Sequence, residues 1–150
     1  MFHVIEDEPY LLKVTKDFIT TAGYEVIGFE SGDAYLRYFH TDSYLPPVAL
    51  ITDFDMPGKN GFKVIKEVRK RIPFLKAVIV SGTIEIAANI HANKHICLGL
   101  AKPYQPKQLF SLLQSLMECE QSNPPVPACL KSKRCGFGIE HGCPFYTNSY

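Results

Sequence analysis

The chain has 150 residues, of which 46% are hydrophobic and 21% charged, a composition that suits one soluble domain with a buried core. Its formal net charge of +1 provides no overall attraction for nucleic acid or an anionic membrane. The first apolar run stops at Glu6 and Asp7, too early for a signal peptide, and no segment approaches the roughly 18 apolar residues of a membrane span. We therefore expect a cytoplasmic protein without a nucleic-acid-binding domain.

Short apolar runs predict buried strands, and amphipathic segments between them predict helices. Pro9 suits a first helical turn, Gly23 suits a left-handed helix end, and Ser31 suits an N-cap. In chain order, we predict strand 2–5, helix 8–23, strand 24–29, helix 31–39, strand 47–52, helix 62–72, strand 75–81, helix 84–92, strand 95–101 and helix 105–119. This alternation predicts an α/β fold, a doubly wound five-stranded parallel sheet with five helices.

The composition changes after residue 119. Residues 120–128 are polar and proline-rich, as in a linker, and residues 129–150 form a cysteine-rich tail without clear periodicity. We therefore divide the chain into a domain at 1–119, a linker and an irregular tail. The tail is interpreted as a metal-binding or docking appendage, or as disordered.

Four tail residues could supply a tetrahedral Zn²⁺ site. They are Cys129, Cys135, His141 and Cys143. Their spacing, C-x5-C-x5-H-x-C, lacks the C-x2-C pair of well-formed zinc sites, so the pattern is weak. Redox-sensitive thiols and incidental cysteines remain alternatives.

Charged and polar residues follow four of the five predicted strands. Glu6 and Asp7 follow the first strand and Asp53 the third, while Ser81 ends the fourth and Lys102 follows the fifth. The carboxyl ends of parallel strands meet at one edge of a sheet, so these side chains are expected to converge there.

Three converging carboxylates repel one another, and a hard divalent cation such as Mg²⁺ relieves that repulsion. Asp53 is then a candidate metal ligand and also a candidate nucleophile, because a carboxylate can attack phosphorus to give an acyl phosphate. Lys102 and Ser81 would stabilise the transferring phosphoryl group. A haloacid-type phosphatase, with Asp55 as general acid, shares this chemistry and is one alternative.

Four motifs in this order, "VIEDEP", "LITDFDMPGKNG", "AVIVSG" and "LAKPY", resemble the receiver domain of bacterial two-component response regulators over residues 2 to about 118. The resemblance implies a flavodoxin-like fold with strand order 2-1-3-4-5. It also implies that Asp53 accepts a phosphoryl group from a sensor histidine kinase or phosphotransfer protein.

The resemblance further assigns the metal and switch residues. Mg²⁺ would be held by Glu6, Asp7, Asp53 and the main-chain carbonyl of Asp55. Ser81 and Lys102 match the switch hydroxyl and the lysine of the family, and the Lys102–Pro103 peptide bond is expected to be cis. The protein would assist only its own phosphorylation and dephosphorylation, without other enzymatic activity.

Two features depart from the family. Gly99 stands where relatives carry Tyr or Phe, and Ser81 lies 21 positions before Lys102, one fewer than expected. Phosphorylation would favour binding to an unknown downstream protein, or homodimerisation, through the face formed by strand 75–81 and the helices 84–92 and 105–119. The alternative is a phosphorylation-independent protein-interaction module that uses the fold and its tail.

Overall fold

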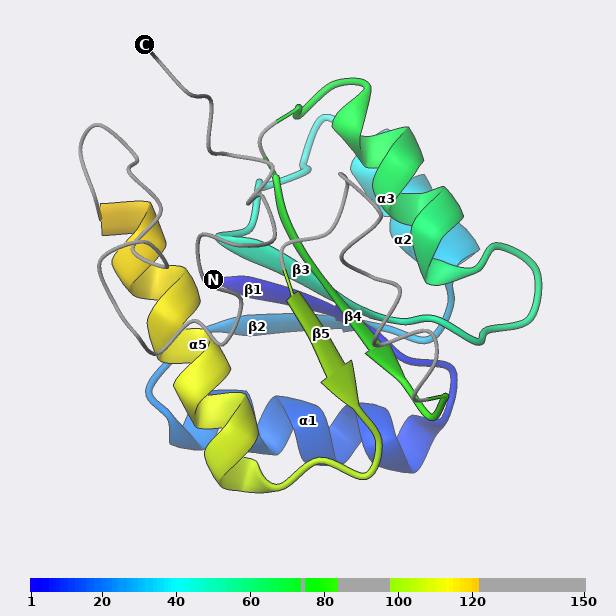
Figure 1. Cartoon of the computed structure of the whole chain (residues 1–150). Coiled ribbons are helices and arrows are strands. Elements are labelled where there is room, and N and C mark those ends of the chain that lie inside the picture. The colour runs from blue at the N-terminus through cyan, green and yellow to red at the C-terminus, as the bar shows by residue number, and fades with distance from the viewer. Residues whose placement is uncertain (74, 84–97, 122–150) are drawn as a thin grey trace, which may run out of the picture.

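Five parallel strands form one sheet, which Figure 1 shows in the computed structural model of the chain. The structure describes residues 1–73, 75–83 and 98–121. The strands are β1 (Phe2–Ile5), β2 (Val26–Phe29), β3 (Ala49–Asp53), β4 (Lys76–Ser81) and β5 (Leu98–Ala101). Their order, β2-β1-β3-β4-β5, confirms the predicted flavodoxin-like sheet.

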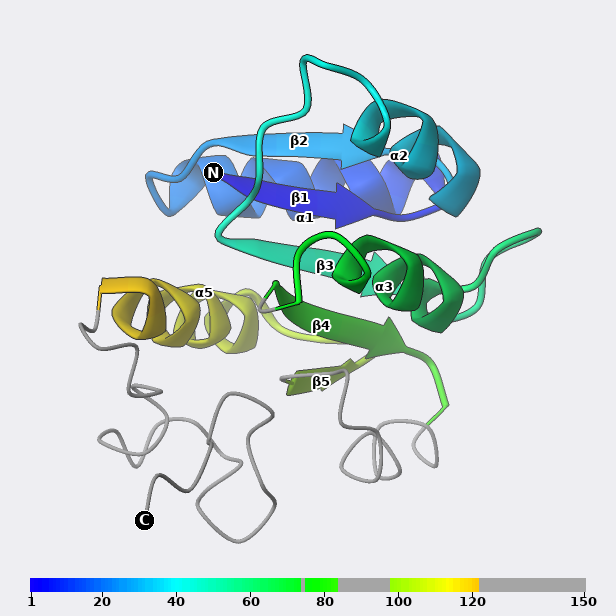
Figure 2. The ribbon, with the colours of Figure 1, turned by 90° about the horizontal axis from the view of Figure 1, so that it is seen from above.

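Two helices cover each face of the sheet in the described part of the chain (Figures 1 and 2). Helices α1 (Pro9–Thr21) and α5 (Pro106–Gln121) lie on one face, and α2 (Gly32–Phe39) and α3 (Gly61–Arg69) lie on the other. Four of the five predicted helices are thereby confirmed. The predicted helix 84–92, the start of the strand predicted at 95–101 and nearly all of the predicted linker and tail fall outside the described residues.

Local capping chemistry agrees with the sequence. Pro9 occupies the first turn of α1, and Gly23 follows this helix with a positive φ of 86°. The Ser31 side chain caps α2 by accepting a hydrogen bond from the Ala34 N–H at 3.1 Å. None of the helices that the structure describes is both long and apolar enough to cross a membrane.

Several predicted boundaries differ from the structure, including the start of β3, which lies at Ala49 rather than at residue 47, and two of the differences have identifiable reasons. The second strand begins at Val26 rather than at residue 24, because the Tyr24 N–H donates to the Ile19 carbonyl and so belongs to the end of α1. Helix α3 ends at Arg69 rather than at residue 72. The N–H groups of Lys70 and Arg71 each donate to the carbonyl three residues earlier, which tightens the chain into turns.

A buried histidine, His3, lies within an aromatic cluster on the α2 side of the sheet. Its ring contacts four other rings edge-on, with centroid distances from 5.6 to 5.9 Å: Phe29, Tyr35, Tyr38 and Tyr44. Nδ1 lies 3.3 Å from the Tyr35 hydroxyl, while Nε2 has no hydrogen-bond partner among the described residues. Burial, followed by the charge of the N-terminus, lowers the pKa of His3 to about 4.

Acidification from pH 6.5 to pH 4 is expected to destabilise the protein through His3. The pKa of His3 is about 4 in the folded protein and near 6.5 when unfolded, so the unfolded chain binds more protons between these values. The free energy of unfolding therefore falls as the pH drops through this window. We expect a loss of about 2 kcal/mol, at about 1.4 kcal/mol per pKa unit and allowing for salt screening of the N-terminal charge.

Urea unfolding between pH 4 and pH 7 measures this slope. His3→Leu removes the titrating group and should flatten the curve relative to wild type. His40→Leu, at an exposed position after α2, is the matched substitution with which the His3→Leu curve is compared. Parallel curves for wild type and His3→Leu would contradict the assignment.

Candidate functional site

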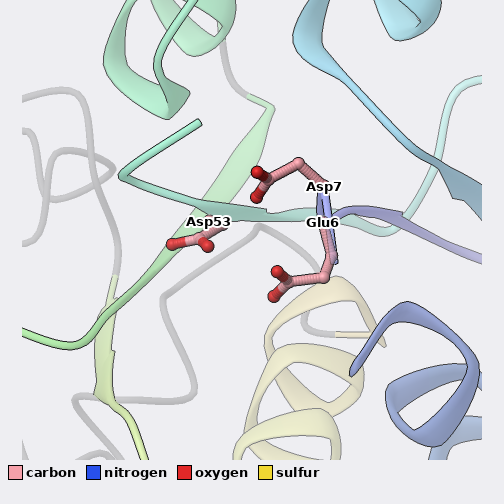
Figure 3. A group of neighbouring side chains, drawn as sticks. All are labelled: Glu6, Asp7 and Asp53. Atoms are coloured by element: carbon pink, nitrogen blue, oxygen red, sulfur yellow. The ribbon is translucent and has the colours of Figure 1, made fainter. Parts of the chain in front are cut away.

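Three carboxylates converge at the carboxyl ends of β1 and β3, where the strand order reverses. Glu6 and Asp7 follow β1, and Asp53 is the last residue of β3. Each offers a carboxylate oxygen, and these oxygens lie within 4.8 Å of one another. Figure 3 shows the three side chains pointing toward a common space. Glu6 and Asp53 are buried, with 5% and 7% of their surface exposed.

Lys102, which follows β5, joins this cluster through its ammonium group. Nζ donates to Asp53 Oδ2 at 2.6 Å and to Glu6 Oε2 at 2.7 Å. The Lys102 main-chain N–H donates to the Ser81 carbonyl at 2.8 Å, which fixes the end of β5 beside β4. The peptide bond between Lys102 and Pro103 is cis, as expected.

Electrostatics in the cluster favour a further cation. Burial raises the pKa of Glu6, although the hydrogen bond from Lys102 opposes this effect. Burial disfavours the Lys102 ammonium, but its hydrogen bonds to Asp53 and Glu6 outweigh burial and raise the pKa of Lys102. Three carboxylates and one ammonium leave a formal charge of two negative units, which a divalent cation would balance.

The carboxylate spacing also fits magnesium. Mg²⁺–oxygen bonds of about 2.1 Å in an octahedron place ligand oxygens about 3 to 4 Å apart. Oxygens within 4.8 Å of one another therefore reach this geometry with small side-chain adjustments. Glu6, Asp7 and Asp53 are the residues that could hold such an ion.

Two other predicted site residues lie beside the cluster. Ser81 is fully buried, and its hydroxyl accepts a hydrogen bond from the Thr83 N–H at 3.1 Å. The Asp55 N–H donates to Asp53 Oδ1 at 3.3 Å, which fixes the turn after β3. The role of the Asp55 carbonyl as a metal ligand stays a prediction. The four predicted zinc ligands in the tail lie outside the described residues.

Gly61 is a positioning residue that the sequence patterns missed. It starts α3 directly against the end of β3, and its N–H donates to the Phe54 carbonyl at 3.3 Å. A Cβ at this position would lie 2.4 Å from the Asp53 carbonyl oxygen and 2.9 Å from Ile79 Cδ1. Only glycine permits this approach, so Gly61 helps to fix the backbone of Asp53. The glycine at the end of "MPGKNG" was the available signal.

Gly61→Ala is expected to destabilise the protein by about 2 kcal/mol, because the new methyl group meets the Asp53 carbonyl oxygen, a backbone atom that cannot rotate away. Urea unfolding checks this value. Gly82→Ala is the matched control, since a Cβ there would meet no atom of the described residues within 4 Å beyond its chain neighbours and should change stability by no more than about 0.5 kcal/mol. Equal stabilities for the two variants would contradict the role of Gly61.

The β5 position where relatives carry an aromatic holds Gly99, which pairs with Ile79 of β4. A different aromatic, Tyr104, lies two residues after Lys102. Its hydroxyl is 2.5 Å from Thr15 Oγ1 on α1. Tyr104 therefore links the segment that carries Lys102 to α1, a connection that the sequence did not indicate.

Comparisons with known proteins agree with this architecture. Residues 2–114 match the response regulator receiver domain family. The chain is 31% identical over 116 residues to the chemotaxis protein CheY of Thermotoga maritima, with 75% of this chain and 93% of that protein covered. It is 28% identical over 119 residues to the transcriptional regulatory protein BaeR of Escherichia coli, with 76% of this chain and 46% of that protein covered.

Solved structures show the same fold. A response regulator receiver domain protein from Clostridium thermocellum superposes with a TM-score of 0.69 at 24% identity, covering 80% of this chain and 95% of that one. The response regulator TrrA of Thermotoga maritima, solved in complex with Mg²⁺-BeF, gives a TM-score of 0.66 at 22% identity, covering 77% of this chain and 96% of that one. The chain thus spans nearly all of CheY but less than half of BaeR. It belongs to the response regulator receiver domain family.

Proposed function

We propose that this protein is a phosphorylation-dependent response regulator in which Asp53 is the phosphoacceptor. The observation that carries the proposal is the position of the Asp53 carboxylate. It lies 2.6 Å from the Lys102 ammonium and within 4.8 Å of the Glu6 and Asp7 carboxylate oxygens. A nucleophile, a cation and a candidate metal site therefore meet at one point.

In the proposed reaction, an oxygen of Asp53 attacks the phosphorus of a phosphohistidine on a sensor histidine kinase or phosphotransfer protein. The new O–P bond forms as the P–N bond to histidine breaks, which gives an aspartyl phosphate. Mg²⁺ bound to the acidic cluster would supply charge neutralisation for the incoming phosphoryl group. The Mg²⁺-BeF complex of the neighbour TrrA supports this metal.

Lys102 and Ser81 would move in response to phosphorylation of Asp53. In the described structure the Lys102 ammonium contacts Asp53 and Glu6. A phosphoryl group on Asp53 brings new oxygens that compete for this ammonium and for the Ser81 hydroxyl. Movement of these two groups would favour one of two conformations of the protein surface, as in other proteins whose conformational equilibrium is shifted by a modification.

The remaining assignments are also proposals. The receiver domain would occupy 1–119, followed by the linker and the cysteine-rich tail, and the protein would act in the cytoplasm. Signalling through β4, the predicted helix 84–92 and α5 stays a prediction, since part of that face falls outside the described residues. The family match does not favour the phosphorylation-independent module or the phosphatase interpretation.

The test is the intact mass of the full chain after incubation with acetyl phosphate and Mg²⁺. One phosphoryl group adds about 80 Da by acyl-phosphate chemistry, and omission of Mg²⁺ should prevent the gain. Beryllofluoride binding separates a short-lived phosphate from an inactive site. Failure of both would refute the proposal, and steady turnover of a small phosphate ester would favour a phosphatase instead.

A further inference from the structure

Positive charge gathers in a groove between α2 and α3, on the face opposite α1 and α5. One hollow of about 520 Å³ is lined by Asp33, Leu36, Arg37, His40, Lys59 and Glu67. An adjoining hollow of about 280 Å³ adds Lys63, Lys66 and Lys70. We call these nine residues the α2–α3 groove. Five cations and two anions give it a formal excess of three positive charges, whereas the whole chain carries only +1.

Part of this charge has no counterpart nearby. Lys59 contacts Asp33 at 3.4 Å, and Lys70 contacts Glu67 at 2.6 Å. The side chains of Arg37, Lys63 and Lys66 form no ion pair with any residue that the structure describes. All three are exposed. They are therefore available to an external anionic group.

The position of Lys63 opposes helix stability. Asn60 caps α3 and its side chain accepts a hydrogen bond from the Lys63 N–H, which places Lys63 in the first turn. The helix dipole favours acidic residues there and disfavours a lysine, and Glu at this position would complete a capping interaction. The first turn of α3 contains no acidic residue.

The spacing of the lysines adds a second unfavourable effect. Lys63, Lys66 and Lys70 follow one another at i+3 and i+4, where like charges repel across successive helical turns. A negatively charged ligand offsets both effects. The lysines thus form a surface suited to a negatively charged ligand.

We propose that the α2–α3 groove binds an acidic helical segment of a partner protein. Lys63 lies in the first turn of α3 and Lys70 caps its C-terminal end, seven residues later and about 10 Å along the axis, which matches two turns of a helix with acids at i, i+3 and i+7. Asp33 and Glu67 alternate with the cations and repel a uniform polyanion such as nucleic acid. A protein segment can place its own basic residues against these two carboxylates.

A second copy of this chain does not supply the partner from its described helices. Helix α1 contains one acidic residue, Asp17, which already pairs with Lys13 at 2.8 Å. Helices α2 and α3 contain one acidic residue each, and the two of α5 are two positions apart, which is not a spacing of i, i+3 or i+7. Leu36, the apolar residue that lines both hollows, is only 5% exposed and offers little apolar surface to a ligand. Binding in the α2–α3 groove is therefore expected to be mainly electrostatic and sensitive to salt.

The test measures how tightly the full chain binds a helical peptide in low salt. The peptide is alanine-based, has both termini blocked, and carries glutamates at i, i+3 and i+7. Lys63→Glu/Lys66→Glu should weaken binding by at least about tenfold. Lys13→Glu/Lys107→Glu makes the same change in net charge at exposed positions outside the groove, and should alter affinity by less than about twofold. Lys63→Glu alone should also weaken binding, by less than the double variant does.

The proposal would be overturned if the peptide did not bind, or if both double variants lost the same amount of affinity for it. Tighter binding of a short DNA duplex or of phosphatidylserine vesicles through the same lysines would also overturn it in favour of those partners. The measurement uses neither a phosphoryl donor nor Mg²⁺. Its outcome is therefore independent of whether Asp53 is phosphorylated.

Discussion

Asp53→Asn is expected to abolish completely the mass gain of about 80 Da that acetyl phosphate and Mg²⁺ produce. The amide that replaces the carboxylate is a poor nucleophile. The change also removes one member of the acidic cluster and the 2.6 Å ion pair with Lys102. Since Asn has nearly the shape of Asp, the fold should persist, and a circular dichroism spectrum like that of wild type verifies this.

Asp55→Asn is the matched control for this substitution. Asp55 lies two residues further along the same turn, is exposed, and contacts Asp53 through its main-chain N–H. Its side chain has no part in the proposed chemistry, so this variant should still gain the phosphoryl mass. A full adduct in Asp53→Asn would place the acceptor elsewhere, as would loss of the adduct in Asp55→Asn alone.

Lys102→Met is expected to destabilise the protein by about 3 kcal/mol in the presence of EDTA. Methionine retains an apolar stem but no charge, which leaves the buried carboxylates of Glu6 and Asp53 without their ammonium partner. Added Mg²⁺ should recover part of the loss by binding the folded state. Urea unfolding with EDTA and with Mg²⁺ measures both effects.

Two further variants define the cause of that loss. Lys107→Met removes an exposed lysine of α5 and should change stability by less than about 0.5 kcal/mol. Glu6→Gln combined with Lys102→Met removes one of the two uncompensated charges and should be more stable than Lys102→Met alone. If Lys102→Met unfolds like wild type in EDTA, the ion pairs contribute nothing measurable to stability.

The sequence predicted the fold well because its local signals agree with its topology. Alternating apolar and amphipathic segments identified the sheet and all four described helices. Single residues such as Pro9, Gly23 and Ser31 identified helix ends correctly, because each acts through its own backbone geometry or one nearby hydrogen bond. The predicted start of β2 at Tyr24 and the predicted end of α3 beyond Arg69 were wrong because backbone hydrogen bonds that composition does not encode decide these ends.

The candidate site was predictable as a set of residues but not as an arrangement. Topology brings the ends of β1, β3, β4 and β5 to one edge, so the members could be named in advance. The two contacts of Lys102 join residues 49 and 96 positions apart, and their geometry depends on how the strands pack. The close approach of Gly61 to Asp53 is likewise a consequence of packing.

The ion pairs of Lys102 also bear on how the domain is made during translation. Glu6 and Asp53 emerge from the ribosome long before Lys102, which lies 96 residues after Glu6. Burying those two carboxylates earlier would leave them without a cation, at a cost of several kcal/mol per ion. Closing β1 and β3 around these two carboxylates is therefore unfavourable until the segment that carries Lys102 has been synthesised. A nascent chain that stops before Lys102 should therefore be readily degraded.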